Sequence, residues 1–325
     1  MSAAGGTRAI VAALVANMGI AAAKFVGFLI TGSSSMIAES AHSAADSGNQ
    51  ALLLLGGRTA RRRATEEHPF GYGRDRYFYA FLVALVLFTL GSLFSLYEGI
   101  HKLQHPEDLK SAEVAIIILA VAIVLEAFSL RTAVQESNKV RGKASWVQFI
   151  RRAKAPELPV VLLEDTAALL GLVFALVGVS LAAITGNGTW DGVGTIAIGV
   201  LLGVVAIILI VETKSLLMGE AASPDAVDRI RAALVGQGVD RVIHLRTMHL
   251  GPDELLVAAK IAMPRTTSLE RVADAIDTAE RRVRAAEPMA RVVYLEPDLD
   301  RSPSPRRGGP SPEVPEFADP IDQSP

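Results

Sequence analysis

Six long apolar runs constrain this chain more than any other feature of its sequence. They cover about residues 9–31, 35–57, 77–100, 112–133, 158–185 and 192–217. A helix needs about 20 apolar residues to cross the hydrocarbon core of a bilayer. Half of the 325 residues are hydrophobic and the mean hydropathy is +0.36, which is too apolar for an ordinary soluble protein of this size. The pattern predicts an all-α membrane bundle of six transmembrane helices.

Basic residues alternate between the loops that join these runs. The loops before the second run and before the sixth have none, and the loop before the fourth has only Lys102 and Lys110. The other two loops contain Arg58, Arg61, Arg62, Arg63 and Arg74, and then Arg131, Lys139, Arg141, Lys143, Arg151, Arg152 and Lys154. The positive-inside rule therefore predicts a multi-pass protein with both termini cytoplasmic. We expect a bacterial plasma membrane, and a first run that spans it rather than a cleaved signal peptide.

After Met218 the composition changes to that of a small soluble domain. A helix of about 12 residues is predicted from Ser223-Pro-Asp-Ala, strands over 242–250, 255–262 and 290–296, and a second helix over 267–286. The order is αββαβ, which is typical of a ferredoxin-like α+β fold. We expect a membrane domain over 1–218, a cytoplasmic domain over 219–297 and a disordered tail, rich in Pro and Ser, over 298–325.

His42 and Asp46 are the first candidate site residues. They lie four residues apart in the second apolar run, so a helix places both on one face. Ionisable groups at membrane depth are costly unless they pair, bind an ion or line a water-filled cavity. The chain has no cysteine, so metal ligands must come from His, Asp and Glu. The pair indicates a divalent transition-metal site, and the alternative is a structural hydrogen-bonded pair between helices.

Glu164 and Asp165 form a second acidic cluster within an apolar run. Such residues usually mark an ion pathway, but Pro156 and Pro159 place the start of this run only a turn or two away. Access of the two acids to interfacial water is therefore the alternative.

The other polar residues in the apolar runs have simpler interpretations. Lys24 is expected to snorkel or pack, Glu39, Asn17 and Asn49 to form hydrogen bonds between helices or line the cavity, and Glu98 and Glu126 to pair helices.

Four motifs resemble the cation diffusion facilitator family of metal/proton antiporters. They are residues 32–49, which contain His42 and Asp46, then His68-Pro-Phe-Gly-Tyr-Gly-Arg74, Tyr97-Glu-Gly-Ile100 and Leu245-Arg-Thr-Met-His-Leu-Gly-Pro252. With the six runs and the αββαβ module, the resemblance covers roughly residues 8–297. Residues 160–171 resemble the branch of the family that contains the mammalian mitochondrial zinc transporter nine.

The resemblance implies a transport site of His42, Asp46 and Asp165, with Glu164 as the fourth metal ligand. The fifth span of most members contains His-x-x-x-Asp. When the comparison is anchored on Gly171, Asp165 falls on the Asp position and Val161 on the His position. The longer side chain of Glu164 is expected to reach the site from the neighbouring helical position.

Two accessory metal sites of the family are altered in this chain. The loop before the third run keeps only His68, with Tyr72 where a second His is often found, so we expect that site to be lost. In the soluble domain, His244, His249 and Glu296 remain as a weak site, whereas Lys260 and Tyr294 replace His ligands. A lysine there would repel a divalent ion, so we expect no tight two-metal site.

The resemblance implies a secondary active transporter and not an enzyme. It would export a divalent metal cation, Zn²⁺ first, in exchange for protons, because protonation of imidazole and carboxylates expels the metal. A site with one imidazole and up to three carboxylates also suits Mn²⁺, Fe²⁺ or Co²⁺. We expect no prosthetic group, a homodimer formed through the soluble domain, and no nucleic-acid binding at a net charge of −2. A non-transporting metal sensor or scaffold, and a passive channel, are the alternatives.

Overall fold

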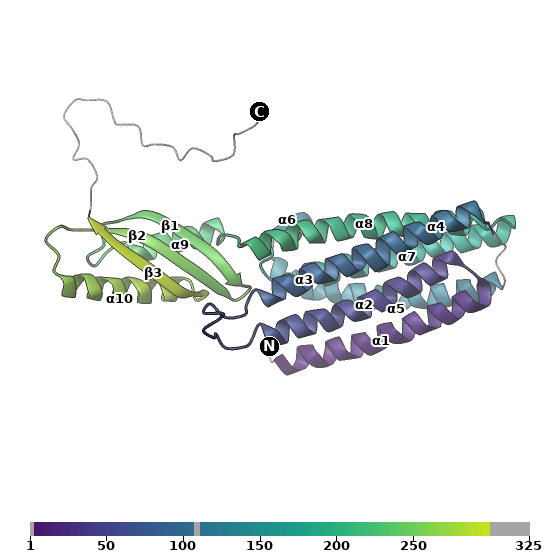
Figure 1. Ribbon diagram of the computed structural model, residues 1–325, viewed down its shortest axis with the longest axis horizontal. Coiled ribbons are helices and arrows are strands. Elements are labelled where there is room, and N and C mark those ends of the chain that lie inside the picture. Colours follow the sequence, from purple (N-terminus) through teal and green to yellow (C-terminus); the bar gives the residue numbers. More distant parts are fainter. Residues whose placement is uncertain (1–2, 107–110, 300–325) are drawn as a thin grey trace, which may run out of the picture.

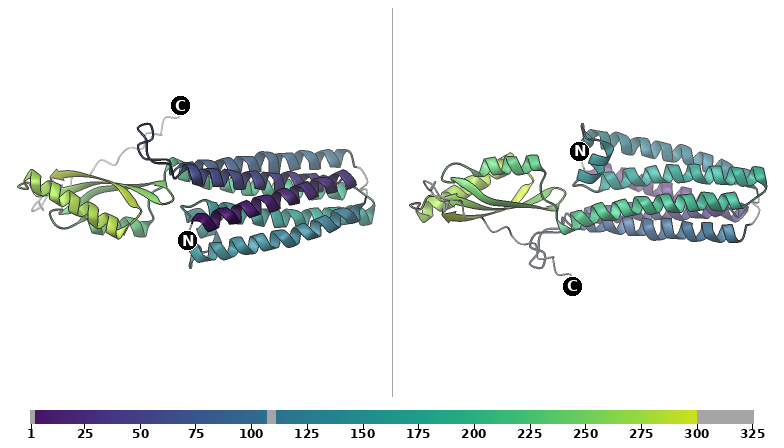
Figure 2. Two further views of the ribbon diagram at one scale, coloured as in Figure 1. Left: turned by 90° about the horizontal axis from the view of Figure 1, so that it is seen from below. Right: turned by 90° about the horizontal axis from the view of Figure 1, so that it is seen from above.

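Six long helical segments run side by side as an elongated bundle, with a smaller α+β unit at one end (Figures 1 and 2). The computed structural model describes residues 3–106 and 111–299. The segments are α1 (Ala3–Thr31), α2 (Ser34–Thr59), the continuous α3 (Asp75–Val86), η1 (Leu87–Leu93) and α4 (Phe94–Gln104), then α5 (Ala112–Arg141), α7 (Glu157–Thr185) and α8 (Thr189–Met218). Each predicted apolar run lies inside one of these segments.

The fourth segment is longer than the sequence predicts. α5 continues to Arg141 instead of ending near residue 133, and a short helix, α6 (Trp146–Arg152), follows it. The charged last turns of α5 keep an apolar stripe, because Ala133 packs with Phe149 of α6 and Leu162 of α7. Part of the predicted basic loop is therefore helical.

Within the described residues, four helical segments are long and apolar enough to cross a membrane. They are Asp75–Gln104, Ala112–Arg141, Glu157–Thr185 and Thr189–Met218, and Asn17–Thr31 forms a shorter apolar helix. α2 is more polar than these, and its polar side chains face inward. Glu39, His42, Asp46 and Asn49 are all buried. Burial of these groups among other helices is compatible with a position inside a bilayer.

Small residues bring the third segment close to α8. Ser92 in the π-helical η1 donates a hydrogen bond of 2.8 Å to the carbonyl of Gly199. A side chain at Gly199 would meet the backbone N of Leu96 at 2.9 Å, so only glycine allows this approach. Close packing of small residues is the usual means of association between membrane helices.

The smaller unit has the predicted αββαβ order. It contains α9 (Pro224–Leu234), β1 (Arg241–Gly251), β2 (Glu254–Met263), α10 (Leu269–Ala286) and β3 (Ala290–Leu299). The central strand β2 is antiparallel to β1 and parallel to β3. Alternate residues of β2, Val257 and Ile261 among them, pack against buried residues of α9 and α10.

The last strand extends past its predicted end at Glu296. Asp298 and Leu299 belong to β3 and pair with Ala262 and Met263, although the sequence analysis assigned them to the tail. Backbone pairing with β2 overrides the effect of Pro297 on the local propensity. The rest of the predicted tail, residues 300–325, lies outside the described residues.

Polar contacts join the bundle to the smaller unit. Arg76 of α3 donates to Glu157 of α7 at 2.5 Å and to Asp253 in the turn between β1 and β2 at 3.0 Å. Lys154 forms an ion pair with Glu220, just after α8. Although burial alone would raise the pKa of Glu220, hydrogen bonds from Lys154 and Ser215 hold it below its usual value.

Candidate metal site

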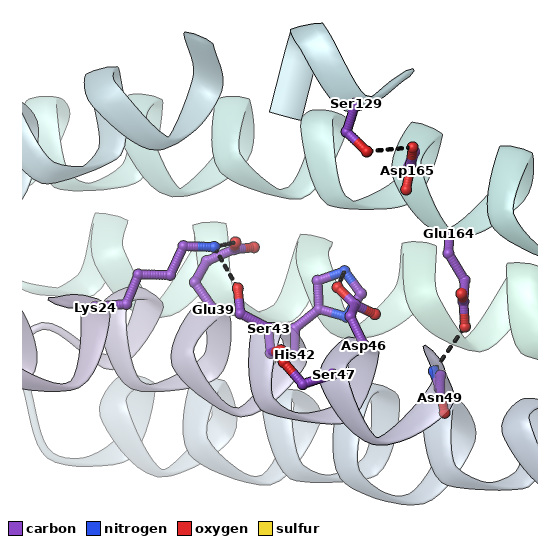
Figure 3. Close-up of polar contacts among 10 residues, drawn as sticks. All are labelled: Lys24, Glu39, His42, Ser43, Asp46, Ser47, Asn49, Ser129, Glu164 and Asp165. Atoms are coloured by element: carbon purple, nitrogen blue, oxygen red, sulfur yellow. Dashed lines mark hydrogen bonds and ion pairs between the residues drawn. The ribbon is translucent and has the colours of Figure 1, made fainter. Parts of the chain in front are cut away.

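His42 and Asp46 lie on one buried face of α2, as their spacing predicts (Figure 3). The helix starts where Ser33 accepts a hydrogen bond from the backbone N of Met36, and Asp191 of α8 accepts one from the backbone N of Ser34 at 2.7 Å. His42 is fully buried. Its Nε2 lies 3.6 Å from Asp46 Oδ2, which is beyond hydrogen-bond distance.

The polar atoms of this pair are available to a ligand. Among the described residues, the two ring nitrogens of His42 have no hydrogen-bond partner, and Oδ1 of Asp46 has none either. Most buried polar side-chain atoms in proteins do have one, because an unpaired buried donor or acceptor costs about 1–3 kcal/mol. Coordination of a cation by the imidazole and the carboxylate would satisfy these atoms.

Glu164 and Asp165 point to different neighbours of α7. Glu164 is buried and accepts a hydrogen bond of 2.6 Å from Asn49 of α2, whereas Asp165 accepts one of 2.8 Å from Ser129 of α5 (Figure 3). Adjacent helical residues point about 100° apart, so only one of them faces α2 directly. The resemblance implied that Asp165 was this residue, but Glu164 makes the contact. Both acids remain close enough to Asp46 for their charges to interact.

The four predicted ligands do not converge on one point, because Asp165 turns toward Ser129 of α5 while Glu164 contacts α2. In residues 3–106 and 111–299, no group of three His, Asp or Glu side chains is gathered tightly enough to hold a metal ion.

Lys24 and Glu39 form a buried ion pair beside this site, which the sequence analysis missed. Lys24 Nζ lies 3.0 Å from Glu39 Oε2 and donates to Ser43 at 2.8 Å. Lys24 is fully buried, so of the two expected roles, snorkelling and packing, the structure shows packing. A signal was present in the sequence. Lys24 precedes the turn at Gly32 by about as many residues as Glu39 follows it, so an antiparallel helix pair brings them to the same depth.

A cavity of about 610 Å³ lies between α1 and α5. Most of its lining is apolar, but Asn17, Lys24, Glu126 and Ser129 also line it. Ser129 is the hydrogen-bond donor to Asp165, so the cavity ends beside the acidic cluster.

The three candidate ligands of the smaller unit are not brought together. His244 and Glu296 flank Lys260 in one row across β1, β2 and β3. Lys260 pairs with Glu296 at 2.9 Å and Asp298 at 3.3 Å, and these hydrogen bonds raise its pKa. His249 is five residues beyond His244 on the same strand and therefore faces the other side of the sheet. In the loop before α3, His68 is exposed and packs against the ring of Tyr72.

Comparisons with known proteins match the part of the chain that forms the bundle. Residues 10–218 match the family model described as the cation efflux transmembrane domain. The chain is 35% identical over 242 residues to the proton-coupled zinc antiporter SLC30A9, mitochondrial, of Xenopus laevis, covering 73% of this chain and 43% of that protein. The human protein of the same name is 34% identical over 241 residues, with shares of 73% and 42%. Metal tolerance protein C4 of Arabidopsis thaliana is 30% identical over 257 residues, with shares of 78% and 56%. The chain thus spans less than half the length of these animal relatives.

Proposed function

Because this chain belongs to the cation efflux family, we propose that it is a secondary transporter that exports a divalent metal cation, Zn²⁺ first, in exchange for protons. The observation that carries the proposal is the buried pair of His42 and Asp46, whose ring nitrogens and carboxylate Oδ1 have no hydrogen-bond partner among the described residues. Glu164 of the neighbouring helix lies close enough for its charge to interact with that of Asp46. The proton-coupled zinc transport named in the relatives supports the same choice.

Metal and protons compete for the same atoms in this mechanism. His42 binds the ion through a neutral ring nitrogen, and Asp46 and Glu164 bind it as carboxylates. The two carboxylates neutralise a divalent charge that would otherwise be costly inside the bundle. Protonation of these groups releases the metal, so one site serves both ions. Rocking of the helices around the site would expose it to each side of the membrane in turn.

We assign six membrane spans, a membrane domain over residues 1–218 and a cytoplasmic domain over 219–297, in a bacterial plasma membrane with both termini inside. The positions of the basic residues support this orientation. Arg58 at the end of α2, Arg141 at the end of α5 and Arg151 in α6 lie at the end of the bundle that carries the smaller unit (Figure 1).

The ligand set also favours a second group of substrates. A site with one imidazole among carboxylates is a harder ligand set than one with two imidazoles, so Mn²⁺, Fe²⁺ and Co²⁺ are the alternatives to Zn²⁺.

We further propose a symmetric homodimer that forms through the cytoplasmic domain. Tyr294, which is exposed on β3, supports an interface there, and a two-fold symmetric pair is the commonest oligomer.

Metal uptake into proteoliposomes tests the function directly. The full chain is reconstituted, a pH gradient is imposed, and uptake of Zn²⁺, Mn²⁺, Fe²⁺ and Co²⁺ is followed, with Asp46→Ala as the matched control. We expect saturable Zn²⁺ uptake that increases with the gradient and is absent in the control. Flux independent of the gradient would indicate a channel, and a protein that binds metal without flux would indicate a sensor or scaffold.

A further inference from the structure

The ion pair of Lys24 and Glu39 is buried as completely as any in the described bundle. Both side chains are at most 1% exposed, and Lys24 Nζ contacts Glu39 Oε2 at 3.0 Å and Ser43 at 2.8 Å. Removing two charges from water costs several kcal/mol per ion, and apolar residues of the same size often stabilise a protein equally well. Stability alone is therefore a weak reason for this pair, and its position beside the metal site suggests another.

Glu39 lies one helical turn from the proposed metal ligand His42. It is three residues before His42 on α2, so both side chains emerge from the same face. Only one of its oxygens is held by Lys24, because Oε1 has no hydrogen-bond partner among the described residues. That oxygen points toward α7, where a side chain at Gly171 would meet it at 2.7 Å.

Several charged groups face this ion pair from the helices packed around it. They are His42 and Asp46 of α2 and Glu126 of α5. Among these groups and the ion pair itself, Lys24 is the one lysine or arginine, and it forms its ion pair with Glu39. Without Lys24, Glu39 would be a further carboxylate beside the transported ion.

We infer that Lys24 is a positioning residue that withholds Glu39 from the metal. The inference rests on the proposed function, since it presumes that a cation binds at His42, Asp46 and Glu164. By neutralising Glu39, Lys24 limits the number of carboxylates that bind the ion and the number of protons exchanged for it. The site then binds a divalent ion loosely enough to release it, as a transporter must.

Calorimetric titration of the purified full-length chain with Zn²⁺ tests this role. Titrations in two buffers of different ionisation enthalpy give both the affinity and the number of protons released. In Lys24→Gln, Glu39 loses its cationic partner and becomes a further carboxylate ligand, and a ligand must be deprotonated to bind Zn²⁺. We expect the affinity at pH 8 to increase by about tenfold and about one additional proton to be released per ion.

The double variant separates the role of Glu39 from a general effect of charge. Lys24→Gln with Glu39→Gln should return the affinity and proton count to the wild-type values. If the double variant binds as tightly as Lys24→Gln, Glu39 is not a ligand and the inference is wrong. It is equally wrong if Lys24→Gln changes neither quantity. Lys102→Gln is the matched control, since Lys102 is buried at the other end of the bundle near the carbonyl of Gly32. This variant should bind Zn²⁺ as the wild type does.

Glu39→Gln provides a second test should Lys24→Gln fail to fold. The unpaired ammonium of Lys24 would then turn toward the remaining carboxylates and weaken Zn²⁺ binding by about tenfold, and an unchanged affinity overturns the inference. The two hypotheses fail in different ways. A wild-type chain that does not bind Zn²⁺ contradicts the proposed function, whereas unchanged variants of a chain that does bind it contradict only the role of Lys24.

Discussion

Asn49 on α2 donates a hydrogen bond of 2.6 Å to Glu164 on α7, so Glu164 is the one of two adjacent acids that contacts α2 through a hydrogen bond. Asp165 is turned about 100° away and accepts its hydrogen bond from Ser129 of α5. An alignment anchored on Gly171 favours Asp165, whereas the rotation of α7 about its own axis favours Glu164.

Glu164 and Asp165 should therefore contribute unequally to metal binding. Glu164→Gln is expected to abolish Zn²⁺ binding, because it removes the α7 carboxylate that is hydrogen-bonded to α2. Asp165→Asn should weaken binding by about tenfold through the loss of a nearby charge. Calorimetry of both variants in detergent measures the difference. The opposite order of effects would restore Asp165 as the direct ligand.

Asp46→Ala should abolish metal transport while the protein still folds and inserts. The variant removes one of the few charge-neutralising groups at the site, and among the described residues no hydrogen bond to Asp46 Oδ1 would be lost. Flux in proteoliposomes and the elution volume of the detergent-solubilised protein are the two readouts. Near-normal saturable flux would remove Asp46 from the site.

His42→Asp should change the metal preference from Zn²⁺ toward Mn²⁺. His42 is the one imidazole of the proposed site, so its replacement leaves only oxygen ligands, which suit the harder ion. Competition between the two metals in transport assays gives the ratio of their affinities. We expect that ratio to shift by about tenfold or more, and an unchanged ratio would mean that His42 does not contact the metal.

Gly178→Ala should lower the thermal stability of the bundle. A methyl group at Gly178 of α7 would meet the carbonyl oxygen of Trp190 in α8 at 2.9 Å, and backbone cannot move aside as a side chain can. We expect a loss of about 1–3 kcal/mol. The matched control is Gly19→Ala in α1, where nothing lies within 4 Å and alanine should leave stability unchanged or raise it slightly. Thermal melts in detergent compare the two.

The smaller unit should lose stability as the pH falls below about 6.5. Burial, and then the charge of Lys154, lower the pKa of His249 in the folded protein. The unfolded chain therefore binds the proton more readily, so stability is full above the unfolded pKa and declines as the pH falls through it. His249→Gln should show a smaller decrease in melting temperature between pH 7.5 and pH 5.5. An equal decrease in both proteins would exclude His249 as the cause.

The positions of the helices and strands could be predicted from the sequence because they depend on local pattern. Apolar runs of membrane length set the segments of the bundle, and the change of composition after Met218 marks where the αββαβ unit begins. The pairing of His42 with Asp46 was predictable for the same reason, since four residues make one turn of a helix. The spacing of His244 and His249 also carried a signal, because residues five apart in a strand face opposite sides.

The contacts between helices were decided by the tertiary structure. Whether Glu164 or Asp165 faces α2 depends on the rotation of α7, and that rotation is set by close packing against neighbouring helices at Gly171 and Gly178. The pairing of Lys24 with Glu39 likewise required the tight antiparallel packing of α1 on α2, which places both charges away from water. Local sequence determines which residues a helix carries, but only the packed bundle determines which of them meet, because that choice depends on the shapes of all the neighbouring side chains at once.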